Sequence, residues 1–258
     1  MAGIRAVLLD LDGTLYEDGV ALPGAAAAVA ELRRRGLAVG FVTNTTSRPR
    51  RALAARLDRI GIPAEPGRIS TALRAGAVHL QARGLTRIAP YVPEPALEDL
   101  ADFTVDHERP EAVVIGDLER GWTFDALNRA FRQLMGGAEL IALSRDRYWK
   151  KPEGLVLDCG VFVAALEYAT GKQAALCGKP GPGFYRAALA ALGPAFAERP
   201  HEALMVGDDL WGDVDGAQRA GLKACLVRTG KFRADVLASS GVHPDLTIET
   251  IGDLPNSL

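Results

Sequence analysis

The sequence is poor in cysteine and histidine, and neither residue is spaced for a metal site. Three cysteines occur, Cys159, Cys177 and Cys225, an odd number without a C-x-x-C pair. This pattern excludes a disulfide framework and a zinc site of the usual spacing. The four histidines are scattered along the chain, and we assign them no role. We therefore expect reduced thiols in or near the core.

The chain also lacks a dominant charge and any long apolar run. Its 30 Lys and Arg residues nearly balance 32 Asp and Glu residues, and a net charge of −2 gives no broad attraction for nucleic acid or an anionic membrane. No stretch approaches the ~18 apolar residues of a membrane span. Only four apolar residues separate Arg5 from Asp10, so we expect no secretory leader and a cytoplasmic location.

The chain contains enough apolar residues to form a sizeable hydrophobic core. At 258 residues, 48% hydrophobic and 24% charged, the chain has the composition of a folded globular protein with one large domain or two. Lysine is scarce, with six among the 30 basic residues, so each lysine merits inspection.

The motif that organises the chain is AVLLDLDGTLYEDG at residues 6–19. Its continuous apolar start is typical of a strand buried on both faces, and Asp10 and Asp12 follow at i and i+2. Side chains two residues apart on an extended chain point to the same side, so both carboxylates can face one pocket. Their repulsion raises one of the two pKa values unless a cation such as Mg²⁺, which prefers oxygen ligands, is bound. The alternative is an ordinary Asp-Gly turn.

Strands and helices are predicted to alternate along the rest of the chain. Short apolar runs indicate buried strands, and longer amphipathic runs with Pro near the start or Gly at the end indicate helices. The predicted strands after the first are 37–47, 87–93, 112–118, 139–143, 174–180, 203–209 and 223–230, and the predicted helices are 22–36, 48–60, 71–84, 124–137, 161–171, 182–193 and 214–222. This alternation predicts an α/β fold, a Rossmann-like, doubly wound parallel sheet with helices on both faces.

Polar residues follow four of the predicted strands, in a set that suits phosphoryl transfer. They are Asp10 and Asp12, Thr43 and Asn44, Lys179, and Asp208, Asp209 and Asp213. In a doubly wound sheet the carboxyl ends of neighbouring strands converge on one crevice. There, one carboxylate can attack phosphorus and another can move a proton, while a hydroxyl, an ammonium and Mg²⁺ can hold the phosphate oxygens.

These motifs resemble those of the haloacid dehalogenase superfamily. DLDGT, FVTN, GKP and GDDLWGD stand in the superfamily's order and span residues 10–213. The resemblance implies that Asp10 is the nucleophile and Asp12 the general acid/base. The metal ligands would be Asp10, Asp12 through its backbone carbonyl, and Asp208. Asp209 and Asp213 would contact these ligands without binding the metal directly.

The remaining motif residues are implied to hold the phosphate. Thr43 and Asn44 would bind it, and Lys179 would offset the negative charge on nucleophile and phosphate. Each residue also has a structural alternative. Thr43 and Asn44 could cap the helix that follows, Lys179 could be solvated before a proline turn, and Asp213 could be the N-cap of the helix predicted at 214–222.

The spacing of the motifs predicts an inserted domain. Thirty-two residues separate Asp10 from Thr43, but 135 separate Thr43 from Lys179, about a hundred more than a strand-helix unit requires. This surplus resembles the large α/β cap of subclass IIA, the branch with p-nitrophenyl phosphatase-like enzymes. We predict a catalytic core at 1–84 and 178–258 and a substrate-selecting cap at 85–177.

One segment of the predicted cap is both basic and aromatic. SRDRYWKK at 144–151 contains Arg145, Arg147, Tyr148, Trp149, Lys150 and Lys151. We hypothesise that Arg147 and Trp149 bind the leaving group of the substrate. The alternative is a solvated basic loop or a dimer contact. Caps of this type often pair, so we expect a homodimer through the cap.

The sequence thus predicts a Mg²⁺-dependent phosphatase that hydrolyses a small phosphorylated substrate through an aspartyl-phosphate. A dehalogenase needs neither a metal nor a second acid, so Asp12 and Asp208 argue against it. A phosphomutase usually carries its cap between the first two motifs, where this chain has too little room. The alternative is a non-catalytic scaffold resembling a phospho-receiver, although the length and the inserted cap do not suit a receiver.

Overall fold

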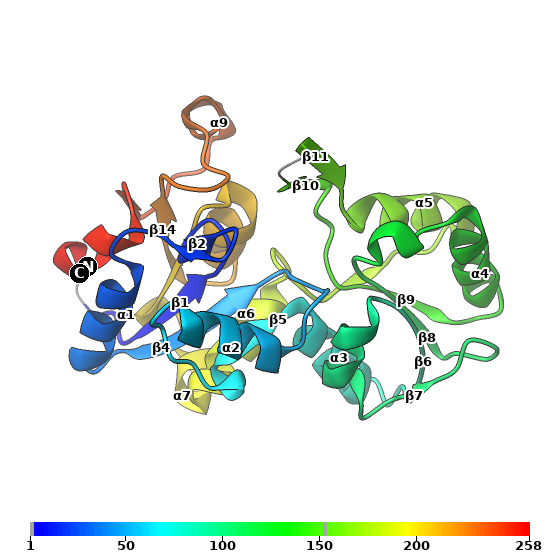
Figure 1. Cartoon of the computed structure of the whole chain (residues 1–258). Helices are drawn as coiled ribbons and strands as arrows, with labels where there is room; N and C mark the ends of the chain where they lie inside the picture. Colours follow the sequence, from blue (N-terminus) through cyan, green and yellow to red (C-terminus); the bar gives the residue numbers. More distant parts are fainter. Residues whose placement is uncertain (1–2, 152–153) are drawn as a thin grey trace. The chain divides into compact units, whose positions relative to one another are not determined.

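The computed structural model describes residues 3–151 and 154–258, and the chain divides into two compact α/β units (Figure 1). The core unit comprises, within the described residues, Met1–Thr43, Arg50–Ser70 and Lys179–Leu258. The inserted unit comprises Asn44–Pro49 and Thr71–Gly178. Each has its own parallel sheet and its own apolar clusters, so the predicted α/β fold is confirmed.

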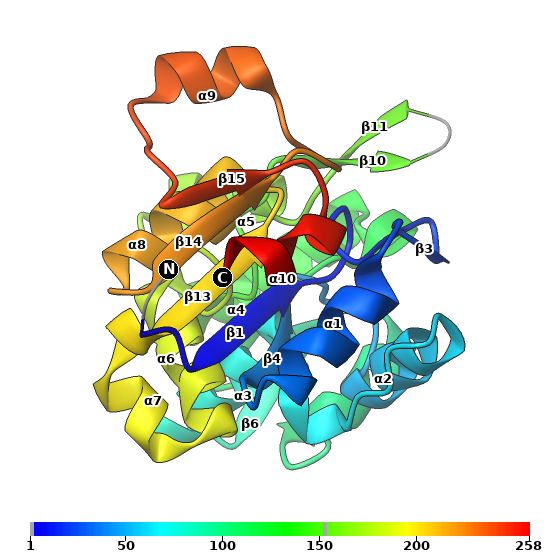
Figure 2. The same cartoon turned by 90° about the vertical axis from the view of Figure 1, so that its left-hand side faces the viewer.

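The core unit is built on a six-stranded sheet. Its strands are β1 (Ala6–Asp10), β4 (Ala38–Thr43), β5 (Ile69–Thr71), β13 (Ala203–Gly207), β14 (Lys223–Val227) and β15 (Leu246–Ile248), in the order β15-β14-β13-β1-β4-β5. Figure 2 shows β15, β14, β13 and β1 side by side. Ala6 lies opposite both Ala203 and Ala38 in parallel pairs, so β1, β4 and β13 start and end level with one another.

Helices cover both faces of this sheet. They are α1 (Ala25–Arg34), α2 (Arg50–Arg59), α6 (Pro182–Leu192), α7 (Pro194–Glu198), α8 (Gly216–Arg219), α9 (Ala234–Ser240) and α10 (Leu254–Ser257). Leu9 and Phe41 point to the face that packs against Leu32 of α1. Residues of alternate position point the other way, and there Leu8 lies beside Gly40 and Leu192 of α6.

Shorter elements complete the core unit. A hairpin of β2 (Tyr16–Glu17) and β3 (Val20–Ala21) follows β1, and a π-helical turn at Leu210–Asp215 precedes α8. Turns of 3₁₀ helix in the two units lie at Pro66–Arg68, Glu94–Leu100, Glu119–Gly121, Pro200–Glu202 and Ile251–Asp253.

The inserted unit has a five-stranded parallel sheet. Its strands are β6 (Arg87–Tyr91), β7 (Thr104–Val105), β8 (Ala112–Ile115), β9 (Glu139–Ala142) and β12 (Ala175–Leu176), in the order β12-β9-β8-β6-β7. Helix α3 (Ala72–Ala82) covers one face, and α4 (Phe124–Met135) and α5 (Gly160–Thr170) cover the other. An antiparallel hairpin, β10 (Tyr148–Lys151) and β11 (Gly154–Leu157), lies between β9 and α5 along the chain.

Two sequence expectations about this unit need correction. Residues 71–84 were expected in the core, but Leu73 and Leu80 of α3 pack with Ile88 and Ile141 of the inserted unit. The predicted strand 174–180 is shortened to β12, which pairs with β9 in the inserted sheet. Lys179 therefore does not end a strand of the core sheet, because it lies in the loop between β12 and α6.

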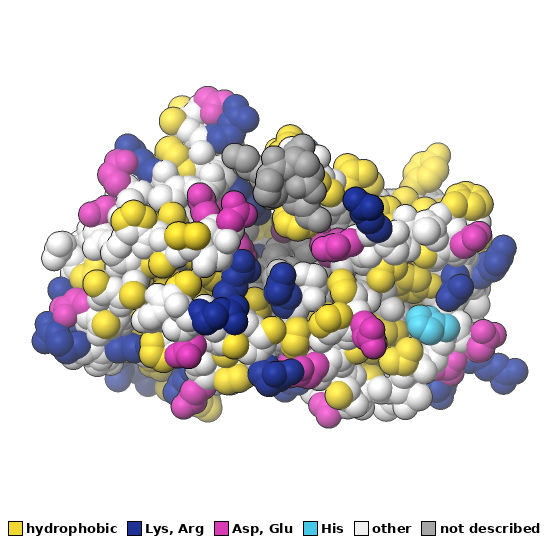
Figure 3. All heavy atoms as spheres, in the orientation of Figure 1, with side chains coloured by type: hydrophobic (Ala, Val, Ile, Leu, Met, Phe, Trp, Pro, Cys, Tyr) yellow, Lys and Arg dark blue, Asp and Glu magenta, His cyan; other side chains and the backbone are white. Residues whose placement is uncertain are grey.

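The surface agrees with the small net charge. Acidic and basic side chains are interspersed on the face drawn in Figure 3. None of the helices in the described ranges combines the length and the apolar character that a membrane crossing requires.

Candidate active site

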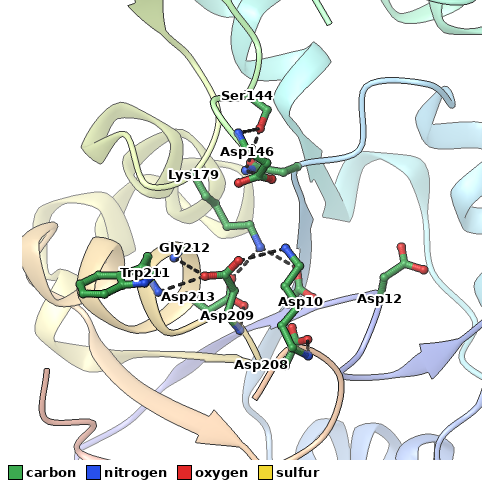
Figure 4. Close-up of polar contacts among 12 residues, drawn as sticks. Asp10, Asp12, Ser144, Asp146, Lys179, Asp208, Asp209, Trp211, Gly212 and Asp213 are labelled. Atoms are coloured by element: carbon green, nitrogen blue, oxygen red, sulfur yellow. Dashed lines mark hydrogen bonds and ion pairs between the residues drawn. The ribbon is translucent and has the colours of Figure 1, made fainter. Parts of the chain in front are cut away.

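The candidate site of the core unit is centred on the buried ammonium group of Lys179. Its Nζ lies 2.6 Å from Oδ1 of Asp10 and 2.6 Å from Oδ1 of Asp213. Figure 4 shows the Lys179 side chain reaching between these two carboxylates. Because Lys179 is only 4% exposed, the alternative of a solvated lysine before a proline turn is wrong.

A third buried carboxylate, that of Asp208, joins this group. Single carboxylate oxygens of Asp10, Asp208 and Asp213 all lie within 4.8 Å of one another. The strand register explains the meeting: Asp10 ends β1, and Asp208 follows directly after β13, which is paired with β1 in parallel. The carboxyl ends of adjacent parallel strands thus bring together residues that are far apart in the sequence.

Burial and mutual repulsion set the proton affinities of the cluster. Burial raises the pKa of Asp10, and the charge of Lys179 opposes this rise. Burial, with the charges of Asp10 and Asp213, holds the pKa of Asp208 well above its usual range. Burial likewise raises the pKa of Asp213 to about 7, against the pull of Lys179. Burial would lower the pKa of Lys179, but Asp10 and Asp213 raise it well above its usual value.

The donor set fits a divalent cation of the magnesium type. Three buried carboxylates lie together, and the ammonium of Lys179 pairs with two of them, those of Asp10 and Asp213. The ionised cluster therefore carries excess negative charge in a region of low dielectric. Carboxylate oxygens are the ligands that Mg²⁺ prefers. Burial is the main cause of the raised pKa values of Asp10 and Asp208, and a divalent cation bound by these two residues would favour their ionised forms.

Asp209 and Asp213 have different local roles. Oδ1 of Asp209 accepts hydrogen bonds from the amides of Trp211 (3.0 Å) and Gly212 (2.9 Å), so Asp209 caps the turn at Leu210–Asp215. Asp213 lies inside that turn, and its Oδ2 accepts the amide of Asp209 at 3.0 Å. The alternative of Asp213 as an N-cap is therefore wrong. The pKa of Asp209 falls to about 2, since Lys231 and the Gly212 amide outweigh burial.

Asp12 lies beside the acidic cluster (Figure 4), and its charge adds to burial in raising the pKa of Asp10. The Asp12 side chain is exposed and lies to one side of the cluster in Figure 4, where the hydroxyl of Tyr16 donates to its Oδ2 at 3.3 Å. The guanidinium of Arg56 stacks on the same tyrosine ring, 4.8 Å from its centroid. Because β1 ends at Asp10, the rule that side chains two residues apart on an extended chain share a face does not extend to Asp12.

Thr43 and Asn44 are adjacent in sequence but differ in their surroundings. Thr43 ends β4 and is 5% exposed, next to Val42, which pairs with Asp10. The amide group of Asn44 donates to Oδ2 of Asp146 at 3.2 Å, within the inserted unit. Neither residue directly precedes α2, which begins at Arg50, so the helix-cap alternative is not supported.

The residues of the basic segment 144–151 have different surroundings. Arg145 forms an ion pair with Glu167 of α5. Arg147 is exposed, and its carbonyl accepts the amide of Asp158 at 3.1 Å. Trp149 lies half-buried in β10. The side chains of Lys150 and Lys151 lie outside the described residues.

One group of contacts, made by residues 229–231, was not expected from the sequence. The amide of Lys231 donates to Oδ2 of Asp208 at 2.6 Å, and its Nζ lies 3.0 Å from Oδ2 of Asp209. The hydroxyl of Thr229 donates to the carbonyl of Gly13 at 2.5 Å. The only available signal was a Thr-Gly-Lys sequence at the end of a predicted strand, which is common in turns.

Known proteins resemble this chain over nearly its whole length. The family model described as haloacid dehalogenase-like hydrolase matches residues 7–104, and a second HAD-hydrolase-like model matches residues 176–254. Phospholysine phosphohistidine inorganic pyrophosphate phosphatase of Rattus norvegicus is 41% identical over 239 residues, covering 90% of this chain and 86% of the relative. Haloacid dehalogenase-like hydrolase domain-containing protein 2 of Rattus norvegicus is 42% identical over 250 residues, covering 96% and 93%.

Solved structures agree with this relationship. The 4-nitrophenylphosphatase of Thermotoga maritima superposes with a TM-score of 0.89 at 29% identity, covering 98% of this chain and 97% of that one. NagD from E. coli K-12 superposes with a TM-score of 0.87 at 27% identity, covering 97% and 98%. The chain therefore belongs to the haloacid dehalogenase-like hydrolases and, within them, to the phosphatases.

Proposed function

We propose that the protein is a Mg²⁺-dependent phosphatase that hydrolyses small phosphorylated molecules through an aspartyl-phosphate on Asp10. The observation that carries the proposal is the buried ammonium of Lys179, shared between Asp10 and Asp213 with Asp208 beside them. Such a cluster holds a carboxylate in one orientation next to a site for a cation. Bound Mg²⁺ would neutralise charge between the nucleophile and the phosphoryl group.

Asp10 is the proposed nucleophile. One of its oxygens is held by Lys179 at 2.6 Å, which fixes the carboxylate and favours its ionised form. An oxygen of Asp10 attacks phosphorus, and the bond to the leaving-group oxygen breaks with its electron pair. Attack of water on phosphorus then releases inorganic phosphate and restores the Asp10 carboxylate.

Asp12 is the proposed general acid and base. The leaving-group oxygen needs a proton in the first step, and the attacking water must lose one in the second. The exposed carboxyl of Asp12 can give the first proton and take the second, so the cycle is balanced. The hydrogen bond from Tyr16 and the position of Arg56 on the tyrosine ring support a defined resting place for this side chain.

The phosphate oxygens are assigned to Thr43, Asn44 and Lys179. Thr43 lies at the end of β4, one residue beyond the partner of Asp10, which supports contact between its hydroxyl and the phosphoryl group. The side-chain amide of Asn44 is already bonded to Asp146, so we assign its role to the backbone N–H. Asp208 and Asp10, with the backbone carbonyl of Asp12, are the proposed metal ligands.

The inserted unit is the proposed source of selectivity. We assign contact with the leaving group to Arg147 and Trp149, since an exposed cation and an indole suit a small phosphorylated organic molecule. The exposed rings of Phe124 and Tyr168 support a homodimer through this unit. We further propose a cytoplasmic location and no nucleic-acid or membrane partner.

The test of the reaction is hydrolysis of p-nitrophenyl phosphate with Mg²⁺ or with a chelator. We expect turnover by the unmodified protein only with Mg²⁺, and a loss of about a thousandfold or more in Asp10→Asn, because the nucleophile is removed. Asp58→Asn makes the same change at an exposed position on α2 and should keep full activity. Absence of turnover with any divalent cation would instead support a non-catalytic scaffold.

The test of selectivity is the Michaelis constant of Arg147→Ala and Trp149→Ala. We expect KM to rise about tenfold or less in each, with a smaller change in kcat, because uniform binding is removed. The substrates should include p-nitrophenyl phosphate, a phosphohistidine, pyrophosphate and a sugar phosphate. Unchanged KM values for the whole set would contradict the role of this segment.

A further inference from the structure

The loop that follows β14, residues 229–231, contacts Asp208 and Asp209 although it belongs to none of the four sequence motifs. We propose that Thr229, Gly230 and Lys231 form a clasp that positions Asp208, and that Lys231 is the positioning residue that sets the affinity of the site for its divalent cation. The inference deepens the proposed function and rests on Asp208 being a metal ligand.

The clasp joins the two loops that carry the acidic residues. Thr229 donates its hydroxyl to the carbonyl of Gly13 at 2.5 Å, and Gly230 donates its amide to Oε1 of Glu17 at 3.1 Å. Gly13 lies in the turn that follows Asp10, and Glu17 lies in β2, the next strand along the chain. The next residue, Lys231, donates its amide to Oδ2 of Asp208 at 2.6 Å. Three successive residues thus tie the segment after β1 to the loop after β13.

Close approach of two glycines seats the carboxylate of Asp208. Gly13 and Gly230 have φ values of +83° and +56°, which side-chain-bearing residues rarely adopt. A Cβ on either glycine would collide with Oδ2 of Asp208, and a Cβ on Gly230 would also lie 2.7 Å from the Cα of Gly13. Asp208 therefore lies between two backbone segments that leave it little choice of orientation.

Lys231 holds the second acidic residue of the motif as well. Its Nζ lies 3.0 Å from Oδ2 of Asp209, whose other oxygen caps the turn at Leu210–Asp215. That turn carries Asp213, the partner of Lys179. One residue thus supports Asp208 through its backbone and Asp213 through the capped turn. Removal of its ammonium group should therefore change the orientation of the metal ligands indirectly, because the ammonium contacts Asp209 and not a proposed ligand.

The contribution of Lys231 should be visible in metal affinity rather than in folding. Its side chain is 55% exposed and that of Asp209 is 22% exposed, so the ion pair itself adds little to stability. Groups that orient metal ligands without binding the metal typically change affinity by about 10-fold to 100-fold when they are removed. The structure also supplies a matched control, because Lys223 and Asp245 form a pair at 2.8 Å with exposures of 50% and 21%.

The experiment is calorimetric titration of Mg²⁺ into the full chain without substrate. Lys231→Met should raise the Kd for Mg²⁺ about tenfold, and Lys231→Arg should restore it to within about threefold of the unmodified protein. Lys223→Met removes an equally exposed ion pair away from the cluster and should leave the Kd unchanged.

A second pair of variants tests the clasp independently of Lys231. Thr229→Val removes the donor to Gly13 and should also weaken Mg²⁺ binding, whereas Thr229→Ser keeps the hydroxyl and should not. Equal Kd values for the unmodified protein, Lys231→Met and Thr229→Val would overturn the inference and leave the proposed function standing. Failure of the unmodified protein to bind Mg²⁺ would instead overturn the metal assignment of the proposed function.

Discussion

Two fully buried threonines differ in whether the side-chain hydroxyl forms a hydrogen bond. Thr14 and Thr71 are both inaccessible to solvent. Oγ1 of Thr71 accepts the amide of Arg74 at 3.0 Å as the N-cap of α3. Among the described residues, Thr14 is the one whose buried side-chain oxygen has no hydrogen-bond partner. A buried hydroxyl without a partner loses its hydration without compensation.

The two threonines should therefore respond in opposite ways to the same substitution. Thr14→Val keeps the shape and removes an unpaired hydroxyl, so the free energy of unfolding should stay constant or rise by about 1 kcal/mol. Thr71→Val removes a helix cap and should lower that free energy by about 1 kcal/mol. Urea unfolding followed by circular dichroism measures both. A loss of stability in Thr14→Val as large as that in Thr71→Val would show that the Thr14 hydroxyl has a partner.

The types of residue that form the site could be predicted from the sequence better than their contacts. Asp10, Lys179 and Asp208 lie together as their residue types suggested, because buried charges need opposite charges nearby. The direction of the Asp12 side chain could not be derived from the i, i+2 rule, since that rule assumes an extended chain and β1 ends at Asp10. Lys231 was not predicted at all, because its main contact with Asp208 is through the backbone, which carries no residue-specific signal.

At the scale of elements, two glycines in helices differ in the space around them, one being open and the other tightly packed. Gly183 lies in the first turn of α6, and a Cβ there would meet nothing within 4 Å. Gly216 begins α8, and a Cβ there would lie 2.6 Å from Cβ of Pro180 and 2.6 Å from the hydroxyl oxygen of Tyr185. Pro180 follows Lys179 directly, so close packing of α8 helps to locate the lysine.

Alanine substitution should distinguish these two positions. Gly183→Ala should raise the free energy of unfolding by about 0.5 kcal/mol, because alanine favours the helix. Gly216→Ala should lower it by about 1–3 kcal/mol, because the added methyl overpacks the contact with Pro180. Gly216→Ala should also reduce phosphatase activity by displacing Lys179. Thermal unfolding and p-nitrophenyl phosphate hydrolysis test both effects. Equal stability of the two variants would contradict the packing argument.

For the whole molecule, the buried acidic cluster links stability to pH. A carboxyl group with a raised pKa binds its proton more tightly in the folded state than in the unfolded state. For Asp213 the pKa rises from 3.8 to about 7, and the pKa of Asp208 is raised as well. The folded state therefore loses stability as the pH rises through this interval. A bound divalent cation should offset the loss, since it favours the ionised carboxylates.

We expect Mg²⁺ to stabilise the protein more at pH 7.5 than at pH 5. At a concentration about a hundredfold above Kd, a ligand adds about 2.7 kcal/mol, and protons compete for the carboxylates at the lower pH. Melting temperatures with Mg²⁺ and with a chelator at both pH values measure the difference. Asp208→Asn is the control and should abolish most of the Mg²⁺ effect. An equal shift at both pH values would contradict the proton linkage.

The sequence by itself determined the kinds of element and the kinds of residue at their ends. Apolar runs and helical periodicity depend on neighbours within one turn or one strand, so the α/β alternation and the four motifs could be recognised locally. The tertiary structure decided which residues meet. It assigned α3 and β12 to the inserted unit, placed Lys179 between Asp10 and Asp213, and brought residues 229–231 to Asp208. These contacts join residues up to 169 positions apart, and packing and strand register create them, neither of which is written in any local stretch of the chain.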